Sequence, residues 1–112
     1  MSQALLSDEA LTRWLAEETL SLCAIPSVTG DEERITSHLS DRVRSLQPRA
    51  SQKRIGNALL VRCGKEGGPR IGLFGHSDTV PPNSAQPHQI DWDGGRIYGL
   101  GSSDMKAGLA VM

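Results

Sequence analysis

One short stretch of the sequence limits what the chain can fold into more than any other: an apolar run that ends directly in a histidine and an aspartate. The run is Ile71–Phe74, and Gly75, His76 and Asp78 follow it. Because its apolar residues do not alternate with polar ones, it predicts a buried strand over 70–75 that is covered on both faces, as in a parallel sheet. Open α/β sheets gather their ligands at the carboxyl ends of strands. The pattern therefore predicts a ligand-binding sheet edge.

His76 and Asp78 have the residue types and the spacing of a metal ligand and its supporting carboxylate. Imidazole is a common zinc ligand, and a carboxylate two residues on lies on the same side of an extended chain, where it can accept the other ring N–H. Each residue also has an ordinary alternative. A lone histidine is more often a hydrogen-bonded core residue, and Asp78 can cap a turn with Thr79. The position of the pair after the predicted strand favours a metal site.

A second cluster, at 99–108, supplies a further oxygen ligand. Asp104 follows Gly99 and Gly101, which let the backbone approach another group closely or adopt a positive φ. In isolation Asp104 is typical of the N-cap of a helix that begins near Met105. The two roles are compatible, because a carboxylate at a helix start can bind a metal ion while the amides orient it. We therefore interpret Asp104 as a candidate metal ligand.

Together the two clusters resemble the first two active-site motifs of the zinc-dependent aminoacylase/carboxypeptidase family of metallopeptidases. The motifs are Gly-His-x-Asp-Thr-Val-Pro at 75–81 and Gly-x-Gly-x-x-Asp-Met-Lys-x-Gly at 99–108, and residues 25–33 are similar to the family's N-terminal segment. Within the family, the desuccinylase branch is the most similar. The resemblance implies that His76 binds one metal ion, that Asp104 bridges two and is followed by a cis peptide, and that Asp78 orients His76. It implies two divalent metal ions, zinc first and cobalt as the alternative.

The resemblance also implies a fold and an assembly. Residues 1–112 correspond to the N-terminal portion of a zinc-exopeptidase-like catalytic domain, an α/β fold with a mostly parallel mixed sheet flanked by helices. The chains of family members continue beyond the two motifs. They contain a pair of adjacent glutamates that supplies the general base, and they also contain further ligands and a dimerisation domain. None of these is present in this sequence, where Glu32 and Glu33 instead open a helix. The expected partners are a small N-acyl amino acid substrate and, for the full-length form, a second copy in a homodimer.

The expected activity of the full-length form is hydrolysis of N-succinyl-LL-2,6-diaminopimelate to succinate and LL-2,6-diaminopimelate. Two alternatives stay open. One is a related deacylase or peptidase, such as an acetylornithine deacetylase, an aminoacylase or a dipeptidase. The other is a non-catalytic, truncated product. The 112 residues alone are expected to be inactive, because His76 and Asp104 lack a matching general base.

Hydrophobic periodicity predicts the remaining elements. A helix over 8–24 begins at Ser7, and a second over 31–47 has the capping-box spacing between Thr29 and Glu32. Gly56 and Asn57 predict a hairpin or a bulge between 52–55 and 58–61. Residues 81–89 are expected to be irregular, and 91–98 to form a turn with a short strand.

Composition excludes several classes of partner. The formal net charge of −1 leaves no electrostatic attraction for nucleic acid or anionic lipid, and neither a spanning segment nor a signal peptide is recognisable, so we expect a cytoplasmic enzyme. Cys23 and Cys63 lack paired spacing and are expected to be reduced, buried packing residues. Among the other polar side chains, we expect His38, His88 and Lys106 at the surface.

Overall fold

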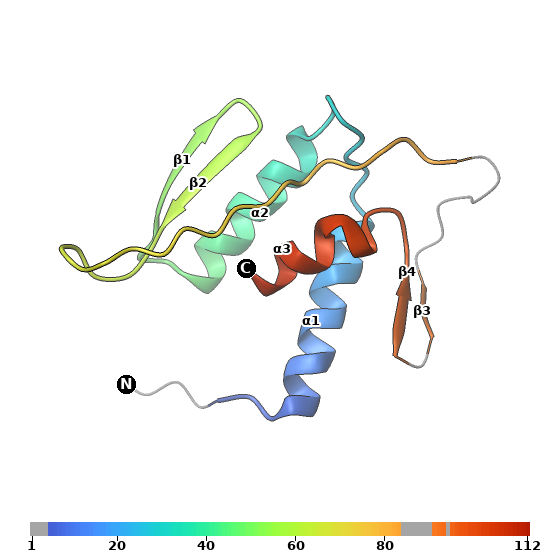
Figure 1. Ribbon diagram of the computed structural model, residues 1–112, viewed down its shortest axis with the longest axis horizontal. Helices are drawn as coiled ribbons and strands as arrows, with labels where there is room; N and C mark the ends of the chain where they lie inside the picture. The colour runs from blue at the N-terminus through green and yellow to red at the C-terminus, as the bar shows by residue number, and fades with distance from the viewer. Residues whose placement is uncertain (1–4, 84–90, 94) are drawn as a thin grey trace.

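The computed structural model describes residues 5–83, 91–93 and 95–112 and contains helices and two small antiparallel sheets (Figure 1). In chain order the elements are α1 (Asp8–Cys23), α2 (Glu33–Leu46), β1 (Ser51–Ile55), β2 (Ala58–Arg62), β3 (Asp91–Asp93), β4 (Arg96–Tyr98), the π-helical segment η1 (Ser102–Lys106) and α3 (Ala107–Val111). This content agrees with the predicted mixture of helices and strands. The long connection from β2 to β3 is the segment that carries the candidate site.

Helix α1 begins and ends close to the positions that the sequence predicts. The Ser7 hydroxyl oxygen accepts a hydrogen bond from the backbone N–H of Ala10 at 3.2 Å, as expected of an N-cap. The helix ends at Cys23, before Pro26. Its buried face includes Leu22, and both η1 and α3 pack against the helix. The C-terminal end of α1 therefore supports the turn that carries Asp104.

Helix α2 lies within the predicted range, but its predicted capping box is absent. Glu32 occupies the N-cap position without a side-chain cap, and its Oε1 accepts the backbone N–H of Gly30 at 2.8 Å. The Thr29 hydroxyl is directed away from the helix, toward a partner 49 residues later in the chain. The spacing thus identified the helix start correctly but gave Thr29 the wrong role.

Of the two alternatives that the sequence leaves open at Gly56 and Asn57, a hairpin or a bulge, the structure has the hairpin. Strands β1 and β2 pair in antiparallel register with Ile55 opposite Ala58, and Gly56 at the turn has a φ of +58°. The hairpin is joined to α2 by polar contacts, among them the Thr36 hydroxyl, which donates to the carbonyl of Asn57 at 3.0 Å. The second hairpin, β3 with β4, pairs Asp91 with Tyr98 and lies apart from the first (Figure 1).

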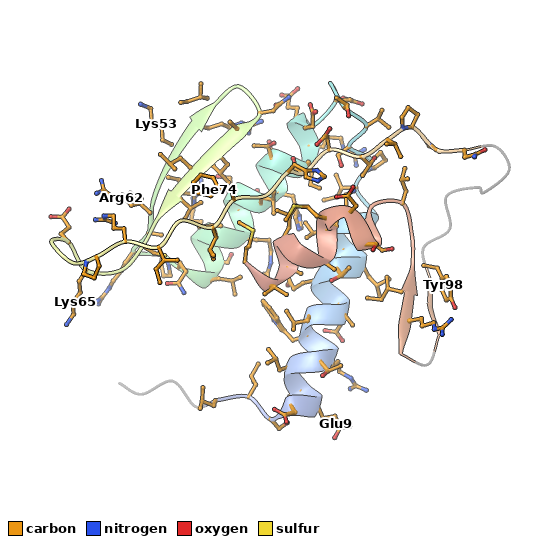
Figure 2. The ribbon with its side chains drawn as sticks, viewed as in Figure 1. Glu9, Lys53, Arg62, Lys65, Phe74 and Tyr98 are labelled. Atoms are coloured by element: carbon orange, nitrogen blue, oxygen red, sulfur yellow. The ribbon has the colours of Figure 1, made fainter. Side chains whose placement is uncertain are left out.

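The predicted buried strand over 70–75 is wrong for this structure. Ile71, Leu73 and Phe74 have exposed fractions of 91%, 67% and 93%, and their segment runs extended without belonging to a strand (Figure 2, where Phe74 is labelled). An apolar run becomes a strand only where a neighbouring strand completes its hydrogen bonds. Among the described residues β1 and β2 pair only with each other, and the mostly parallel sheet is not found. An isolated parallel bridge joins Val28 and Thr79.

Three single-residue expectations also need correction. Cys23 is buried as predicted, whereas Cys63, just after β2, is exposed. His38 is half-buried, not fully solvent-facing as expected, and its Nε2 is inaccessible, with no hydrogen-bond partner among the described residues. Lys106 is buried.

His88 and residues 84–89 of the expected irregular segment lie outside the described residues. None of the described helices is long and apolar enough to span a membrane.

Candidate functional site

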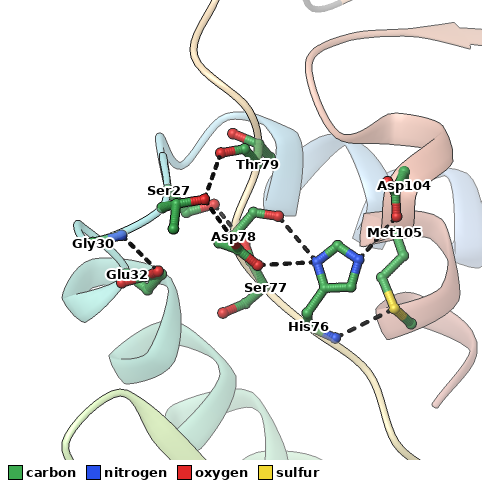
Figure 3. Close-up of polar contacts among 10 residues, drawn as sticks. Ser27, Gly30, Glu32, His76, Ser77, Asp78, Thr79, Asp104 and Met105 are labelled. Carbon is green, nitrogen blue, oxygen red and sulfur yellow. Dashed lines mark hydrogen bonds and ion pairs between the residues drawn. The ribbon is translucent and has the colours of Figure 1, made fainter.

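The residues around Asp78 are held by a segment that precedes them by about fifty positions. The backbone N–H of Thr79 donates to the carbonyl of Ser27 at 2.9 Å, and that of Thr29 donates to the carbonyl of Thr79 at 3.1 Å. The buried Ser27 hydroxyl donates to the carbonyl of Ser77 at 2.6 Å (Figure 3). These contacts fix the backbone on both sides of Asp78.

The structure brings the three predicted site residues together around the His76 imidazole (Figure 3). Its Nδ1 lies 3.1 Å from Oδ1 of Asp78 and 3.2 Å from the Asp78 carbonyl oxygen. Its Nε2 lies 2.9 Å from Oδ1 of Asp104, which is 28 residues away in the chain. A carboxylate therefore lies beside each ring nitrogen, and the one beside Nδ1 is Asp78, as its spacing to His76 predicts. The side chains of His76 and Asp78 are 48% and 33% exposed.

Asp78 has a second partner that sequence analysis missed. Its Oδ2 accepts a hydrogen bond from the Thr29 hydroxyl at 2.6 Å, so that each carboxylate oxygen has its own donor. The Thr29 hydrogen bond is the main reason why the pKa of Asp78 lies below its usual value. No local sequence signal pointed to the contact between Thr29 and Asp78. The spacing from Thr29 to Glu32 indicated a helix cap instead.

Asp104 lies where the backbone departs from helical geometry. Its φ and ψ are −129° and 94°, and its peptide bond to Met105 is cis, as the family resemblance implies. The side chain is 87% exposed and points toward His76, as Figure 3 shows. The Met105 sulfur lies 3.3 Å from the backbone nitrogen of His76 and accepts its N–H. The two motifs are therefore in contact through both residues of this peptide unit.

Lys106 lies next to the site, and the prediction that it is at the surface is wrong. It is only 2% exposed, and its Nζ donates to the carbonyl of Ile25, just after α1, at 2.8 Å. Burial lowers the pKa of this amine below its usual value. Gly101, with a φ of +82°, makes room for this packing, because a Cβ there would lie 2.7 Å from Cγ2 of Thr79 and 3.1 Å from Cδ of Lys106. A surface prediction failed because the carbonyl that Lys106 reaches is 81 residues away.

The three side chains border an open cleft of about 760 Å³. Its walls come from the Thr29 region, from residues 76–82 and from the chain between β4 and η1, including Tyr98. Thr29, His76, Asp78 and Asp104 all contribute to its lining. A molecule that enters this cleft can thus reach the imidazole and the Asp104 carboxylate.

The charges around His76 favour a bound cation. The hydrogen bond to Asp104 raises the pKa of His76 above its usual value, and the Asp78 carbonyl acts in the same direction. Because carboxylates only accept hydrogen bonds, an imidazole bonded to both of them carries a proton on each nitrogen. A metal ion would take the place of the proton on Nε2, since metal ligands must be deprotonated.

The donor set fits a divalent ion, though incompletely. Two ligands at about 2.0 Å from a tetrahedral zinc ion are about 3.3 Å apart, so the 2.9 Å between Nε2 of His76 and Oδ1 of Asp104 needs to widen only slightly. Within the described part of the chain, no three His, Cys, Asp or Glu side chains are arranged to hold one ion together. His76 and Asp104 thus offer two donor atoms on one side of the cleft, fewer than a metal ion needs.

Comparison with known proteins agrees with this reading of the motifs. A succinyl-diaminopimelate desuccinylase of Corynebacterium glutamicum is 38% identical over 94 residues, which cover 83% of this chain and 25% of that protein. A second, from Wolinella succinogenes, is 34% identical over 95 residues, covering 81% of this chain and 26% of that protein. A protein of Thermococcus kodakarensis named for LysW-lysine/LysW-ornithine hydrolysis is 39% identical over 90 residues, covering 80% and 24%.

The chain spans about a quarter of the length of these curated relatives. The sequence profile of peptidase family M20/M25/M40 matches residues 72–112, the segment that contains His76, Asp78 and Asp104. In this segment the chain is similar to peptidase family M20/M25/M40, and over most of its length it is similar to the desuccinylases.

Proposed function

We propose that the complete protein is a metal-dependent amidohydrolase that converts N-succinyl-LL-2,6-diaminopimelate and water into succinate and LL-2,6-diaminopimelate. The observation that carries this proposal is the imidazole of His76, which lies between two carboxylates at the border of a cleft, in the segment that matches the family. The choice of substrate rests on the desuccinylases among the relatives.

We assign distinct roles to the three side chains. His76 would hold a metal ion through Nε2, and the Asp104 carboxylate, which is exposed and lies beside that nitrogen, would be shared between two ions. Asp78 accepts the N–H of Nδ1, which keeps the lone pair on Nε2 and aims it at the metal. Two bound divalent ions, in the first place zinc, would lower the pKa of a water molecule and polarise the scissile carbonyl.

The acidic pair Glu32 and Glu33 does not supply the base for this water. Glu32 is engaged with the N–H of Gly30 and with the side-chain amide of Asn57, at 2.8 and 3.3 Å. Glu33 lies in the first turn of α2, where its charge complements the helix dipole. We propose that the base and the remaining ligands come from outside the described part of this chain. In the complete domain we propose the mostly parallel sheet of the family, with 70–75 as one strand.

The test is an assay of the product of the complete gene, stripped of metal and then reconstituted with zinc or cobalt. We expect stoichiometric release of succinate and diaminopimelate that depends on the added metal. The 112-residue chain, assayed beside it, should release neither product. A complete protein that binds metal but leaves the succinyl amide intact would contradict the proposed substrate.

A second candidate activity is favoured by the Thermococcus relative, whose name describes hydrolysis of LysW-lysine and LysW-ornithine. Its sequence identity to this chain, 39%, is close to the 38% of the Corynebacterium desuccinylase. The same preparation should therefore be offered a LysW-lysine conjugate. Release of lysine without any release of succinate would select this second activity.

A further inference from the structure

We propose that Thr29 is a positioning residue of the metal site, whose hydroxyl holds the Asp78 carboxylate in the orientation in which Asp78 orients His76. This inference rests on the proposed function for its readout in turnover. Its structural basis is the chain of hydrogen bonds from Thr29 to Asp78 and from Asp78 to His76.

The first step of the argument is that Asp78 has little freedom once both oxygens are engaged. Oδ1 faces Nδ1 of His76 at 3.1 Å, and Oδ2 accepts from the Thr29 hydroxyl at 2.6 Å. Without the second bond, rotation about the Cβ–Cγ bond would be restrained by the imidazole alone. A hydrogen bond to an ionised acceptor is about twice as strong as a neutral one. The short contact to Thr29 therefore fixes the plane of the carboxylate.

The second step is that Thr29 itself is fixed by its backbone. Its N–H donates to the Thr79 carbonyl at 3.1 Å, and the Thr79 N–H donates to the Ser27 carbonyl at 2.9 Å. Val28, between these residues, forms the parallel bridge with Thr79. The hydroxyl of Thr29 is thus presented to Asp78 from a backbone that is tied to the same segment as its target.

The third step concerns the direction in which the Thr29 hydroxyl donates. A hydroxyl has one proton, and Oγ1 of Thr29 has two acceptors nearby: Oδ2 of Asp78 at 2.6 Å and the Thr79 carbonyl at 3.3 Å. The shorter distance and the negative charge both select Asp78. This donation engages Oδ2 and leaves Oδ1 to face Nδ1 of His76. An ionised Asp78 can only accept, so Nδ1 of His76 must carry a proton and Nε2 is left for a metal ion.

The experiment compares variants of the complete protein that differ in one hydroxyl group. Thr29→Val removes the hydroxyl at nearly constant shape, and Thr29→Ser retains it. Thr12→Val is the matched control, because Thr12 is also exposed and its hydroxyl donates only to the Asp8 carbonyl within α1. Thr29→Ala provides the same hydroxyl deletion if the valine variant does not fold. Turnover of the succinyl substrate and affinity for cobalt, followed by its absorption spectrum, are measured for each.

We expect Thr29→Val to lower kcat about tenfold, at the lower end of the 10- to 100-fold range for outer partners of metal ligands, with KM little changed. Cobalt affinity should fall in the same variant, Thr29→Ser should recover most of both quantities, and Thr12→Val should equal the wild type. A valine variant with wild-type turnover and cobalt affinity would overturn the proposal. So would a serine variant as impaired as the valine variant, because the methyl group would then be the important part.

The cobalt measurement separates this inference from the proposed function. If the wild type binds cobalt but hydrolyses no succinyl substrate, the proposed substrate is wrong while the role of Thr29 is still decided by the affinities. If the wild type hydrolyses the substrate and the Thr29 variants match it in both measurements, the proposed function stands and the role of Thr29 is refuted.

Discussion

The two halves of the extended chain between β2 and β3 behave differently. In the half at 77–79, backbone and side-chain hydrogen bonds join the chain to Ser27 and Thr29. In the half that contains Ile71–Phe74, the apolar side chains are largely exposed and the backbone belongs to no strand among the described residues. The candidate site lies at the hydrogen-bonded half. Its geometry therefore depends on a few specific hydrogen bonds and does not need the predicted sheet beneath it.

This contrast shows where the constraint on the site is located. The parallel bridge between Val28 and Thr79 connects segments about fifty residues apart, and Ser27 is nearly inaccessible to solvent. On the opposite side of His76, η1 is anchored to the end of α1 through the buried Lys106. Both anchors come from the region around the end of α1. Mutations at the anchors and at the site should thus have larger effects than mutations in the exposed half.

The largest effect is expected from removing the imidazole. His76→Ala deletes the proposed metal-binding nitrogen, so the loss of turnover should exceed the roughly 10- to 100-fold that follows loss of an outer partner. Metal content, measured after dialysis, should fall in the same variant. His38→Ala serves as the control, because His38 lies on α2 and does not line the cleft. Full metal content and normal turnover in His76→Ala would remove the basis for the metal site.

A smaller but still large effect is expected from neutralising Asp78. Asp78→Asn keeps the size of the side chain but loses the anionic acceptor for Nδ1 of His76. We expect kcat to fall about 10- to 100-fold with a modest loss of bound metal. The measurement is steady-state kinetics together with metal analysis. An unchanged rate would show that Asp78 only shapes the turn.

The sequence predicted the site better than the fold beneath it. His76 and Asp78 are close in the chain, so their hydrogen bond follows from extended geometry alone. The assignment of Asp104 to the same site depended on the resemblance of the two motifs to the family, since no local rule places Asp104 against His76. Thr29 was assigned to a helix cap because its spacing to Glu32 fits the capping-box motif. Its actual partner is 49 residues away, beyond the reach of a spacing argument.

The failures in the fold have the same origin. The α1 helix and the first hairpin are set by nearby residues such as Ser7 and Gly56, and both were predicted correctly. Whether Ile71–Phe74 forms a strand depends on a partner elsewhere in the chain. Lys106 was expected at the surface because lysine is seldom buried without a partner, and the carbonyl of Ile25 is a partner that sequence spacing does not reveal.

A stability effect is expected at the Lys106 anchor. Lys106→Met retains an unbranched side chain but leaves the Ile25 carbonyl without its donor. Part of that loss is offset because a charge no longer has to be buried, so we expect a net destabilisation of about 1 kcal/mol. Urea unfolding of the 112-residue chain measures it. Lys65→Met, in an exposed loop, is the control and should remain within about 0.5 kcal/mol of the wild type. Equal stability of the two variants would show that the ammonium does not anchor η1.

The smallest effect is expected in the exposed half of the extended chain. Phe74 is 93% exposed, so Phe74→Ser removes almost no buried apolar surface and should change the free energy of unfolding of the 112-residue chain by less than about 0.5 kcal/mol.

The matched comparison is Ile35→Ala on α2, where the side chain is fully buried. Truncation of a buried isoleucine costs about 2–5 kcal/mol, because apolar contacts are lost and a cavity remains. Urea denaturation of both variants under the same conditions measures the difference. If Phe74→Ser were as destabilising as Ile35→Ala, the exposed half would be covered in solution. The buried strand predicted from the sequence would then describe this segment better than the extended chain does, and the contrast between the two halves would disappear.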